Sequence, residues 1–375
     1  MPTTIDLLRE LVGFATESRT PNRALLDFVI EHTEPLGART HLVPGPEGRA
    51  NLLVSFGPNE PGGLLLAAHT DVVPAGTGWA TPPYELTRAD ERLYGRGTAD
   101  MKGFLAAVLY VLTDIGTWKA PLHLALSFDE EVGCAGMPSM LSCLGVATKV
   151  RPDIVVVGEP TMMVPCHRHL GKVAYEVVMR GTAGHSSRSP DMPSTIPAAA
   201  RVVLALEALQ DAHRSPGPHR LTVNVGTITG GSALNVIAEE CRFSFELRHV
   251  PELNPDEALT PVHEALSTED RNLATVGGGV HVTEATRYPG LATDTSHPLV
   301  KLVERIADSG PCQPIGYGTE GGLYASALAA PVVICGPGDI AVAHRADEYV
   351  SVEQLDRCER FVRALIEQIC IEPAA

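Results

Sequence analysis

The sequence of 375 residues has no excess of basic charge. Its 29 Lys and Arg residues are outnumbered by 45 Asp and Glu, which gives a formal net charge of −16 at pH 7. Nucleic acids and anionic membrane surfaces attract basic proteins, so this balance disfavours both as partners. A strong net charge of one sign also favours solubility. The composition therefore predicts a soluble protein with no nucleic-acid or membrane partner.

The sequence also lacks closely paired cysteines and long apolar segments. Its eight Cys residues are scattered, and none forms a C-x-x-C pair. In a chain of this length, that pattern indicates reduced, packed thiols in a cytoplasmic protein. No apolar run approaches the ~20 residues needed to cross a membrane. The N-terminal MPTTIDLLRELVGF has no basic segment of the kind that begins a signal peptide, so we expect a cytoplasmic protein.

A short apolar run that ends in three consecutive acids is the first distinctive feature. The stretch LHLALSFDEEVG, residues 122–133, is typical of a buried strand that opens into a loop at Glu130 and Glu131. Adjacent side chains on an extended backbone point to opposite sides. One of these acids could therefore hold a cation while the other handles a proton. Acidic loops after strands are common and are usually only solvated, so this stretch alone does not define a site.

Three further apolar runs deliver a His, Asp or Glu just after their last apolar residue. They are residues 64–68, followed by His69-Thr70-Asp71; residues 154–157, followed by Gly158-Glu159; and residues 331–335, followed by GPGDIAVAHRADEY with His344. In open α/β sheets, ligands bind outside the carboxyl ends of the strands. The simplest fold that gathers these residues is a mostly parallel, twisted sheet flanked by helices.

The pattern changes between residues 172 and 285. Strands are expected over 173–180, 221–228, 240–248 and 279–283, and helices over 198–212 and 255–266. The order strand, helix, strand, strand, helix, strand is ferredoxin-like. We therefore expect a catalytic domain formed by residues 1–171 and 286–375, with residues 172–285 inserted into it as a second, α+β domain.

Two histidines and several carboxylates at strand ends or helix starts suit a pair of divalent cations. Imidazole with carboxylate favours zinc, with cobalt or manganese as substitutes. Asp100 is the best candidate to bridge two ions because it lies on a different element, just before a helical pattern. An acid at a helix N-terminus is also favourable on electrostatic grounds alone. Asp71 could accept the second ring N–H of His69 and fix its tautomer, although a lone His-x-Asp motif is usually a surface pair.

Glu130 is predicted to be the general base, because it lies next to the candidate ligand Glu131. It would take a proton from a metal-held water and pass it to a leaving amine. The predicted chemistry is amide hydrolysis. The alternative is a binding or dimerisation module that retains the fold without catalysis. Such a module has no need for a base, so the intact set favours an enzyme.

Six motifs in one order carry a family resemblance. They are LAAHTDVVP, GRGTADMKG, SFDEEVGCAG, VGEPT, GTAGHSS and GPGDIAVAHRADEY. Together they resemble the two-zinc metallohydrolases, a family that includes acetylornithine deacetylase, aminoacylase, succinyl-diaminopimelate desuccinylase and the glutamate carboxypeptidases. The resemblance implies one metal ion on His69, Asp100 and Glu159, and another on His344, Asp100 and Glu131. It also implies that Asp100 bridges the ions, that Glu130 is the base, and that the Asp100–Met101 peptide bond is cis.

The resemblance also assigns roles to the inserted domain, which in this family usually dimerises and serves as a lid. It implies that His185 polarises the scissile carbonyl in the site of the neighbouring subunit. Asn235 and Arg248 match positions that bind the substrate carboxylate. Without the resemblance, His185 reads as an ordinary loop histidine and Arg248 as a solvated strand charge. We expect a homodimer formed through the inserted domain.

The glycine-rich stretch GYGTEGGL contains Thr319 and Glu320. It is not a phosphate-binding loop, because no G-K-[ST] follows. It resembles the substrate-pocket loop of the acetylornithine deacetylase branch, which implies hydrolysis of N2-acetyl-L-ornithine to L-ornithine and acetate, in arginine biosynthesis. Glu320 could attract the substrate ammonium. The alternatives are another N-acyl amino-acid deacylase, acting on succinyl-diaminopimelate or acetyl-citrulline, and a metallo-carboxypeptidase or dipeptidase.

Overall fold

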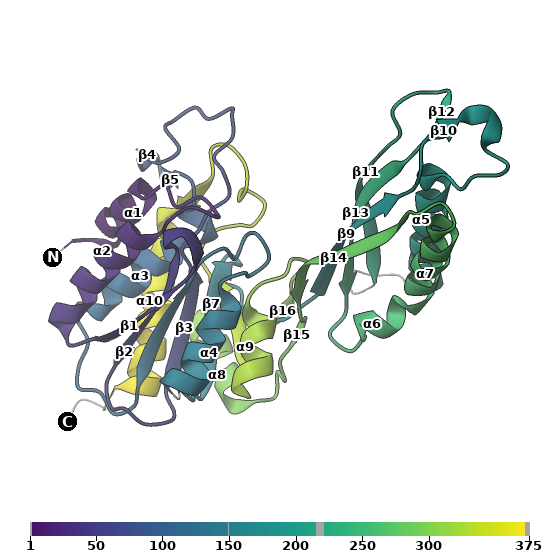
Figure 1. Cartoon of the computed structure of the whole chain (residues 1–375). Coiled ribbons are helices and arrows are strands. Elements are labelled where there is room, and N and C mark those ends of the chain that lie inside the picture. The colour runs from purple at the N-terminus through teal and green to yellow at the C-terminus, as the bar shows by residue number, and fades with distance from the viewer. Residues whose placement is uncertain (1, 149, 215–220, 372–375) are drawn as a thin grey trace. The chain divides into compact units, whose positions relative to one another are not determined.

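The computed structural model describes residues 2–148, 150–214 and 221–371, and its chain divides into two compact units (Figure 1). Unit 1 comprises Met1–Arg168, Leu291–Ile315 and Thr319–Ala375. Unit 2 comprises His169–Gly290 and Gly316–Gly318. Most of unit 2 is thus one continuous stretch that interrupts the sequence of unit 1.

Unit 1 is built on a large, mostly parallel sheet. Its strands are β1 (Arg39–Pro44), β2 (Ala50–Phe56), β3 (Leu64–His69), β6 (Leu122–Ser127), β7 (Ile154–Pro160), β8 (Cys166–His169), β15 (Leu291–Ala292), β16 (Gln313–Pro314) and β17 (Val332–Gly336). Their order is β1-β2-β6-β3-β7-β17-β8-β15, with β16 beside β8. The neighbours β6, β3, β7 and β17 are parallel, whereas β2 and β1 add antiparallel strands at one edge. The predicted mostly parallel sheet is confirmed.

Helices cover both faces of this sheet. Every residue of β2, β3, β6, β7 and β17 is buried, as expected for continuous apolar runs in a sheet covered on both sides. One face shares its core with α1 (Thr4–Gly13), α2 (Arg23–Thr33), α3 (Gly103–Leu112), α8 (Pro298–Ala307) and α10 (Val352–Cys370). On the other face, α4 (Met137–Ser142) packs against β2, β6 and α9 (Gly321–Leu328). The sheet edge that carries the strand ends is therefore held by a rigid, fully packed core.

The closing helix α10 begins after a serine N-cap. Its N-cap Ser351 accepts a hydrogen bond from the backbone N–H of Gln354, 3.2 Å away, which satisfies one of the free donors of the first turn. Its residues Leu355, Cys358, Val362 and Leu365 are buried. Ile369 is only partly buried, because Ile366 and Cys370 occupy the inner face of the last turns.

A small second sheet in unit 1 was not predicted. The segment rich in Pro and Gly that follows Asp71 ends in β4 (Thr87–Ala89), which leads into β5 (Arg92–Tyr94). Strand β18 (Tyr349–Ser351) pairs with β5, so Tyr349 lies opposite Tyr94. After β5 the chain forms the turn η3 (Thr98–Lys102), in which Asp100 and Met101 have non-helical backbone angles, before α3 begins. The Asp100–Met101 peptide bond in this turn is cis, as predicted.

Unit 2 is an antiparallel sheet with two main helices. Its elements are β9 (Gly171–Arg180), β10 (Gly184–His185), α5 (Thr195–Ala212), β11 (Thr222–Gly230), β12 (Val236–Ile237), β13 (Glu240–His249), α6 (Pro255–Ala258), α7 (Thr260–Ala274) and β14 (Gly279–Tyr288). The sheet order β11-β13-β9-β14, with antiparallel neighbours, gives the ferredoxin-like arrangement. The helix predicted over 255–266 is wrong in its bounds, because α6 ends before Leu259 and α7 extends to Ala274.

One face of the unit 2 sheet forms the core of this unit. On β13, Cys241, Phe243, Phe245 and Leu247 are buried and the intervening residues are not, as the alternating sequence predicts. The ring of Phe245 lies 5.3 Å from that of Tyr175 on the neighbouring strand β9. Helices α5 and α7 supply the facing apolar side chains. The sheet therefore buries one face and exposes the other.

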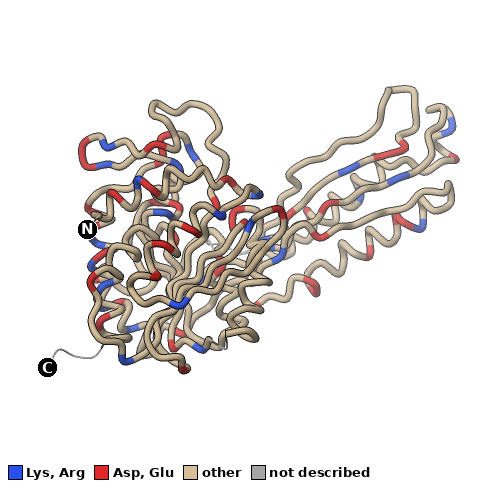
Figure 2. The backbone as a smooth tube through the Cα atoms, turned by 60° about the vertical axis from the view of Figure 1, so that its left-hand side comes forward, with Lys and Arg blue, Asp and Glu red and all other residues tan. Residues whose placement is uncertain are grey.

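Charged residues of both signs occur throughout the described chain. Figure 2 shows Lys and Arg interspersed with Asp and Glu along both units. Across the residues that the structure describes, no helix combines the length and the apolar character needed to span a membrane.

Candidate metal centre

The carboxyl ends of neighbouring parallel strands bring the candidate ligands of unit 1 together. Ala67 on β3 pairs with Val157 on β7, so His69 and Glu159, each two residues further on, lie at the same level of the sheet. On the other side of β3, His69 pairs with Ser127, the last residue of β6. The acidic loop that follows Ser127 therefore starts beside His69. The loop after β17 adds His344.

The His69 ring has one nitrogen fixed by the main chain and one facing acids. Its Nδ1 lies 2.8 Å from the backbone carbonyl oxygen of Asp71, and a carbonyl can only accept, so Nδ1 carries the proton. Its Nε2 lies 3.0 Å from Asp100 Oδ1 and 3.9 Å from Glu159 Oε1. A proton on Nε2 satisfies this contact in the metal-free protein, and a metal ion that replaced that proton would be ligated by the ring and by the facing acids. A ligating histidine usually donates its other N–H in this way.

His344 approaches the other oxygen of the same carboxylate. Its Nε2 lies 3.2 Å from Asp100 Oδ2 and 3.0 Å from Glu131 Oε2. The Asp100 side chain is 6% exposed, whereas that of His344 is 48% exposed and lies at the rim. The two oxygens of one buried carboxylate therefore face two different histidines. This is the arrangement expected of an acid that bridges two ions.

The electrostatics of this cluster favour a bound cation. Burial, reinforced by neighbouring acids, raises the pKa of Glu130, Glu131 and Glu159. Burial also acts to raise the pKa of Asp100, but its hydrogen bonds to His344 and His69 outweigh that and lower it. The pKa of His344 is raised to about 10 by its hydrogen bonds to Asp100 and Glu131. The acids thus repel one another unless positive charge is present, and a divalent ion would supply it.

The described residues contain two groups of potential ligand atoms that lie within 4.8 Å of one another. They are His69 with Asp100 and Glu131, and His69 with Glu130 and Glu159. These groups are composed differently from the two triads that the resemblance implies, and one of them includes the candidate base. All the predicted ligands nevertheless belong to one cluster. Its imidazole and carboxylate donors fit zinc, cobalt or manganese.

Asp71 holds the acidic loop rather than the histidine ring. Its Oδ1 lies 3.8 Å from His69 Nδ1, too far for a hydrogen bond. It accepts instead from the backbone N–H of Glu130 (2.9 Å), while Oδ2 accepts from the N–H of Glu131 (3.3 Å) and from Ser18 Oγ (2.7 Å). The predicted hydrogen bond from the His69 ring N–H to the Asp71 carboxylate is therefore wrong. The reason is that β3 ends at His69, so the two side chains no longer share a strand face.

The three consecutive acids after β6 take different directions. Asp129 adopts a positive φ of 55° and turns away from the cluster, where it accepts from the N–H of Arg19 (2.6 Å) and pairs with the Arg49 guanidinium. Glu130 is half-buried, and its Oε1 accepts from Cys134 Sγ at 3.6 Å. The backbone here is a loop, as expected at the end of the strand. Asp129 anchors it, and the two glutamates remain available to the cluster.

Thr319 and Glu320 lie at the start of α9 and are both buried. Thr319 Oγ1 accepts from the N–H of Gly321 at 2.9 Å, so its hydroxyl stabilises the start of the helix. Glu320 is 1% exposed, and its Oε1 has no hydrogen-bond partner among the described residues. Burial raises its pKa to about 7. A substrate ammonium would therefore meet a buried carboxyl group rather than an exposed charge.

Within unit 2, the two-stranded ribbon β10–β12 brings His185 and Asn235 together. His185 pairs with Val236, and the backbone carbonyl of Asn235 accepts from the N–H of Ser186 at 3.1 Å. His185 Nδ1 accepts from the N–H of Ser187 at 3.2 Å. That contact places the ring proton on Nε2, which can donate to a carbonyl oxygen.

Arg248 lies at the opposite end of the unit 2 sheet. The ribbon follows the end of β9, where Arg180 pairs with Glu240, and β13 then runs eight residues further to Arg248, about 27 Å at the usual strand rise. Arg248 Nε donates to Glu246 Oε1 at 3.0 Å, and its side chain is 30% exposed. The three predicted substrate contacts of unit 2 are therefore not gathered at one place within that unit.

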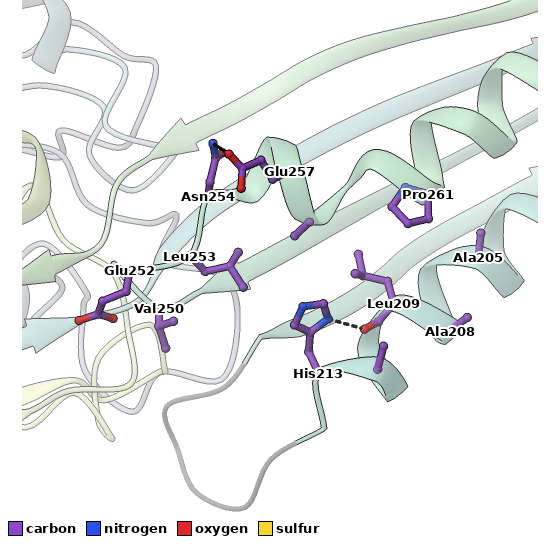
Figure 3. Close-up of a pocket in the computed structure, with 12 residues that line it drawn as sticks. Ala205, Ala208, Leu209, His213, Val250, Glu252, Leu253, Asn254, Glu257 and Pro261 are labelled. Atoms are coloured by element: carbon purple, nitrogen blue, oxygen red, sulfur yellow. Dashed lines mark hydrogen bonds between the residues drawn. The ribbon is translucent and has the colours of Figure 1, made fainter.

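A separate cavity of about 820 Å³ lies in unit 2, between α5 and the segment that runs through α6 into α7 (Figure 3). Its walls are mainly apolar and include Leu209, Val250, Leu253 and Pro261. His213 at one end faces the carbonyl oxygen of Leu209 at 3.0 Å. No residue predicted to bind metal or substrate lines it. This cavity therefore contributes nothing to the candidate metal centre.

Sequence reasoning missed a buried ion pair beside Asp100. Arg96 Nη1 lies 2.6 Å from Glu348 Oε2, and both side chains are at most 2% exposed. Both residues lie inside motifs that were already recognised, GRGTADMKG and GPGDIAVAHRADEY. The sequence signal that could have indicated this pair is that each motif contains a charged residue with no assigned role.

The comparisons with known proteins agree with this fold. The model of "Peptidase family M20/M25/M40" matches residues 65–368. A curated acetylornithine deacetylase of Proteus mirabilis is 32% identical, and the alignment covers 100% of this chain and 99% of that protein. One of Myxococcus xanthus is 34% identical, over 97% of this chain and 96% of that protein.

Solved structures show the same fold at lower identity. An M20 family metallo-carboxypeptidase of Sulfolobus solfataricus superposes with a TM-score of 0.79 at 16% identity, over 98% of this chain and 99% of that one. A dinuclear metal-binding peptidase of the same family from Bacillus subtilis gives 0.66 at 14% identity, over 96% of both chains. The chain belongs to peptidase family M20/M25/M40 and is a hydrolase that acts on amide bonds.

Proposed function

We propose that this protein hydrolyses N2-acetyl-L-ornithine to L-ornithine and acetate, as a step of arginine biosynthesis. The curated relatives that match over nearly the whole chain carry the name acetylornithine deacetylase, which supports this substrate. The observation that carries the chemistry is the pair of histidines on opposite oxygens of the buried Asp100 carboxylate. Glu130, beside this pair, supplies a group that can move a proton.

The proposed cofactors are two divalent metal ions, zinc by preference, with cobalt or manganese as substitutes. The proposed ligands are His69, Asp100 and Glu159 for one ion, and His344, Asp100 and Glu131 for the other. When bound, the ions would supply Lewis-acid activation of a water molecule and of the scissile carbonyl. The pKa values of the acidic ligands, raised by burial, would fall in the presence of that positive charge.

Glu130 is the proposed general base and then the general acid. It accepts one proton from the attacking water and delivers it to the nitrogen of the leaving amine as the C–N bond breaks. Acetate retains the water oxygen. Burial raises the pKa of Glu130, which makes its carboxylate a stronger base toward the water proton. Asp71 accepts hydrogen bonds from the main chain at Glu130 and Glu131, and so fixes the positions of the proposed base and ligand relative to each other.

We assign unit 1 to the predicted catalytic domain and unit 2, predicted as residues 172–285, to a lid that also forms a homodimer. In this proposal His185 of each subunit donates from Nε2 to the scissile carbonyl in the site of the other subunit. Asn235 and Arg248 are proposed to bind the substrate carboxylate.

The remaining substrate contacts are proposed at Thr319 and Glu320. Both are buried at the start of α9, so Glu320 would shape the polarity of the pocket rather than present an exposed charge. We also propose a cytoplasmic location. It is supported by the eight thiols, all buried and unpaired, which suit a reducing compartment.

The test is a substrate panel on purified, zinc- or cobalt-loaded protein. It comprises N2-acetyl-L-ornithine, acetyl-citrulline, acetyl-methionine and succinyl-diaminopimelate, together with dipeptides. The proposal expects the highest kcat/KM for N2-acetyl-L-ornithine. A higher kcat/KM for succinyl-diaminopimelate or for a dipeptide would contradict N2-acetyl-L-ornithine as the substrate. A dipeptide would match the peptidase names of the solved structures.

A further inference from the structure

The Glu348 carboxylate contacts the main chain of the proposed bridging acid. Its Oε1 accepts from the backbone N–H of Ala99 at 2.9 Å and from that of Asp100 at 3.1 Å. Its Oε2 lies 2.6 Å from Arg96 Nη1. One buried side chain thus satisfies two main-chain donors that would otherwise lack partners in a dry environment.

The main chain of Glu348 is tied to the same segment. Its carbonyl accepts from the N–H of Gly95 at 3.0 Å, which extends the pairing of Tyr349 with Tyr94 by one position. Glu348 lies four residues after His344, on the loop that carries this ligand. The residue therefore connects the loop of His344 with the turn of Asp100.

Arg96 is held in turn on several sides. Its Nη2 donates to the carbonyl oxygens of Pro74 (3.3 Å) and Ala75 (3.4 Å), and its guanidinium lies 5.1 Å from the ring centre of Trp79. The Arg96 and Glu348 side chains are 2% and 1% exposed. Breaking a buried pair leaves an uncompensated charge, so Arg96 is what allows Glu348 to remain ionised at this position.

We propose that Glu348, held by Arg96, is a positioning residue of the metal centre. It fixes the main chain at Asp100 and sets the distance between that acid and the loop of His344. The Asp100 carboxylate can then present one oxygen to each histidine. This inference rests on the proposed function in one respect, namely that Asp100 and His344 bind metal.

A buried ion pair could also serve stability alone, and unit 2 offers a control. Glu269, 5% exposed, pairs with Arg201, which is 53% exposed, through contacts of 2.6 and 2.7 Å. Neither residue belongs to the described unit that holds the metal cluster. The variant Glu269→Gln therefore removes a comparable carboxylate without touching Asp100.

The test compares Glu348→Gln, the double variant R96Q/E348Q, and Glu269→Gln. In Glu348→Gln the amide must turn an NH₂ group either toward Arg96 or toward the main-chain donors, so one set of contacts is lost. In R96Q/E348Q the two amides can bond to each other while one oxygen still accepts from the main chain. Zinc affinity is measured by competition with a chromophoric chelator, and geometry by the absorption spectrum of the cobalt form.

We expect Glu348→Gln to weaken zinc binding about 10- to 100-fold and to alter the cobalt spectrum. We also expect faster hydrogen exchange of residues 95–102 in the metal-free protein. The double variant should recover part of the affinity, and Glu269→Gln should retain all of it. Wild-type affinity and spectrum in folded Glu348→Gln, or equal weakening in Glu269→Gln, would overturn the proposal.

The two proposals fail in distinguishable ways. Wild-type protein that binds two zinc ions but leaves N2-acetyl-L-ornithine intact contradicts the proposed substrate, and the comparison of zinc affinities still decides the role of Glu348. Wild-type protein that binds no zinc contradicts both.

Discussion

Substitution of Asp71 by Asn separates its two possible roles. Its carboxylate accepts from the main-chain N–H groups of Glu130 and Glu131, whereas its backbone carbonyl accepts from His69. The amide of Asp71→Asn can keep one oxygen toward the N–H of Glu130. Its NH₂ group then faces the N–H of Glu131. Both groups are donors, so the N–H of Glu131 loses its acceptor. Ser18 can adapt, because its hydroxyl can accept as well as donate.

The magnitude follows from one lost acceptor. A main-chain N–H left unsatisfied in a buried site costs about 1–3 kcal/mol. We therefore expect Asp71→Asn to lower the free energy of unfolding by that amount, measured by urea denaturation in the presence of a chelator. Ser18→Ala, which removes a single part-buried hydrogen bond, should cost about 0.5–1.5 kcal/mol. Zinc affinity of Asp71→Asn should fall by roughly 10-fold or more, because Glu131 is a proposed ligand.

The decisive assay combines hydrogen exchange with ¹⁵N NMR of the histidine rings. The N–H of Glu131 should exchange faster in Asp71→Asn, while the His69 ring keeps its proton on Nδ1, since the Asp71 carbonyl is unchanged. A changed His69 tautomer with unchanged exchange at Glu131 would refute this reasoning. It would restore the ring-orienting role that the sequence alone predicts.

Three further predictions concern the base, the dimer and acid stability. Glu130→Ala should keep its fold and metal content but lose about 10²–10⁴ in kcat; near-normal turnover would contradict its role as the base. His185→Ala and Asp100→Ala, each inactive, should regain some turnover when mixed, and confirmed mixed dimers without activity would exclude action across the dimer. Burial lowers the pKa of His123 to about 4 from the ordinary 6.5, so the folded state favours the neutral ring. The contribution of His123 to the free energy of unfolding is therefore fully present above pH 6.5, and up to about 3 kcal/mol of it is lost as the pH drops to 4. In urea denaturation, the free energy of unfolding of His123→Gln should depend less on pH over this range. An unchanged slope in that variant would assign the acid sensitivity to other groups.

The strand ends of the candidate site could be predicted from the sequence because each is marked locally. An apolar run that stops at His69 or Glu159 signals both a buried strand and a polar group at its end. Parallel strands then bring such ends to one edge, whatever the details of packing. For the same reason, the mostly parallel sheet followed from continuous apolar runs, and the inserted antiparallel sheet from the alternation around Phe243.

The contacts that hold these ligands could not be predicted, since they depend on residues that are distant in sequence. Glu348 reaches the main chain of Asp100 across 248 positions, and no local pattern marks that contact. The role of Asp71 was mistaken because the end of β3 at His69 could not be located to the residue. Strand β5 was missed as well, because three residues with one buried side chain give no periodic signal.

The central claim is that two divalent ions bind around the Asp100 carboxylate. The most direct measurement is the metal content of purified protein, determined by elemental analysis after zinc loading and gel filtration, for the wild type and for Asp100→Ala. We expect two zinc ions per wild-type chain and fewer than one in folded Asp100→Ala. Two zinc ions retained in Asp100→Ala, or none in the wild type, would contradict it.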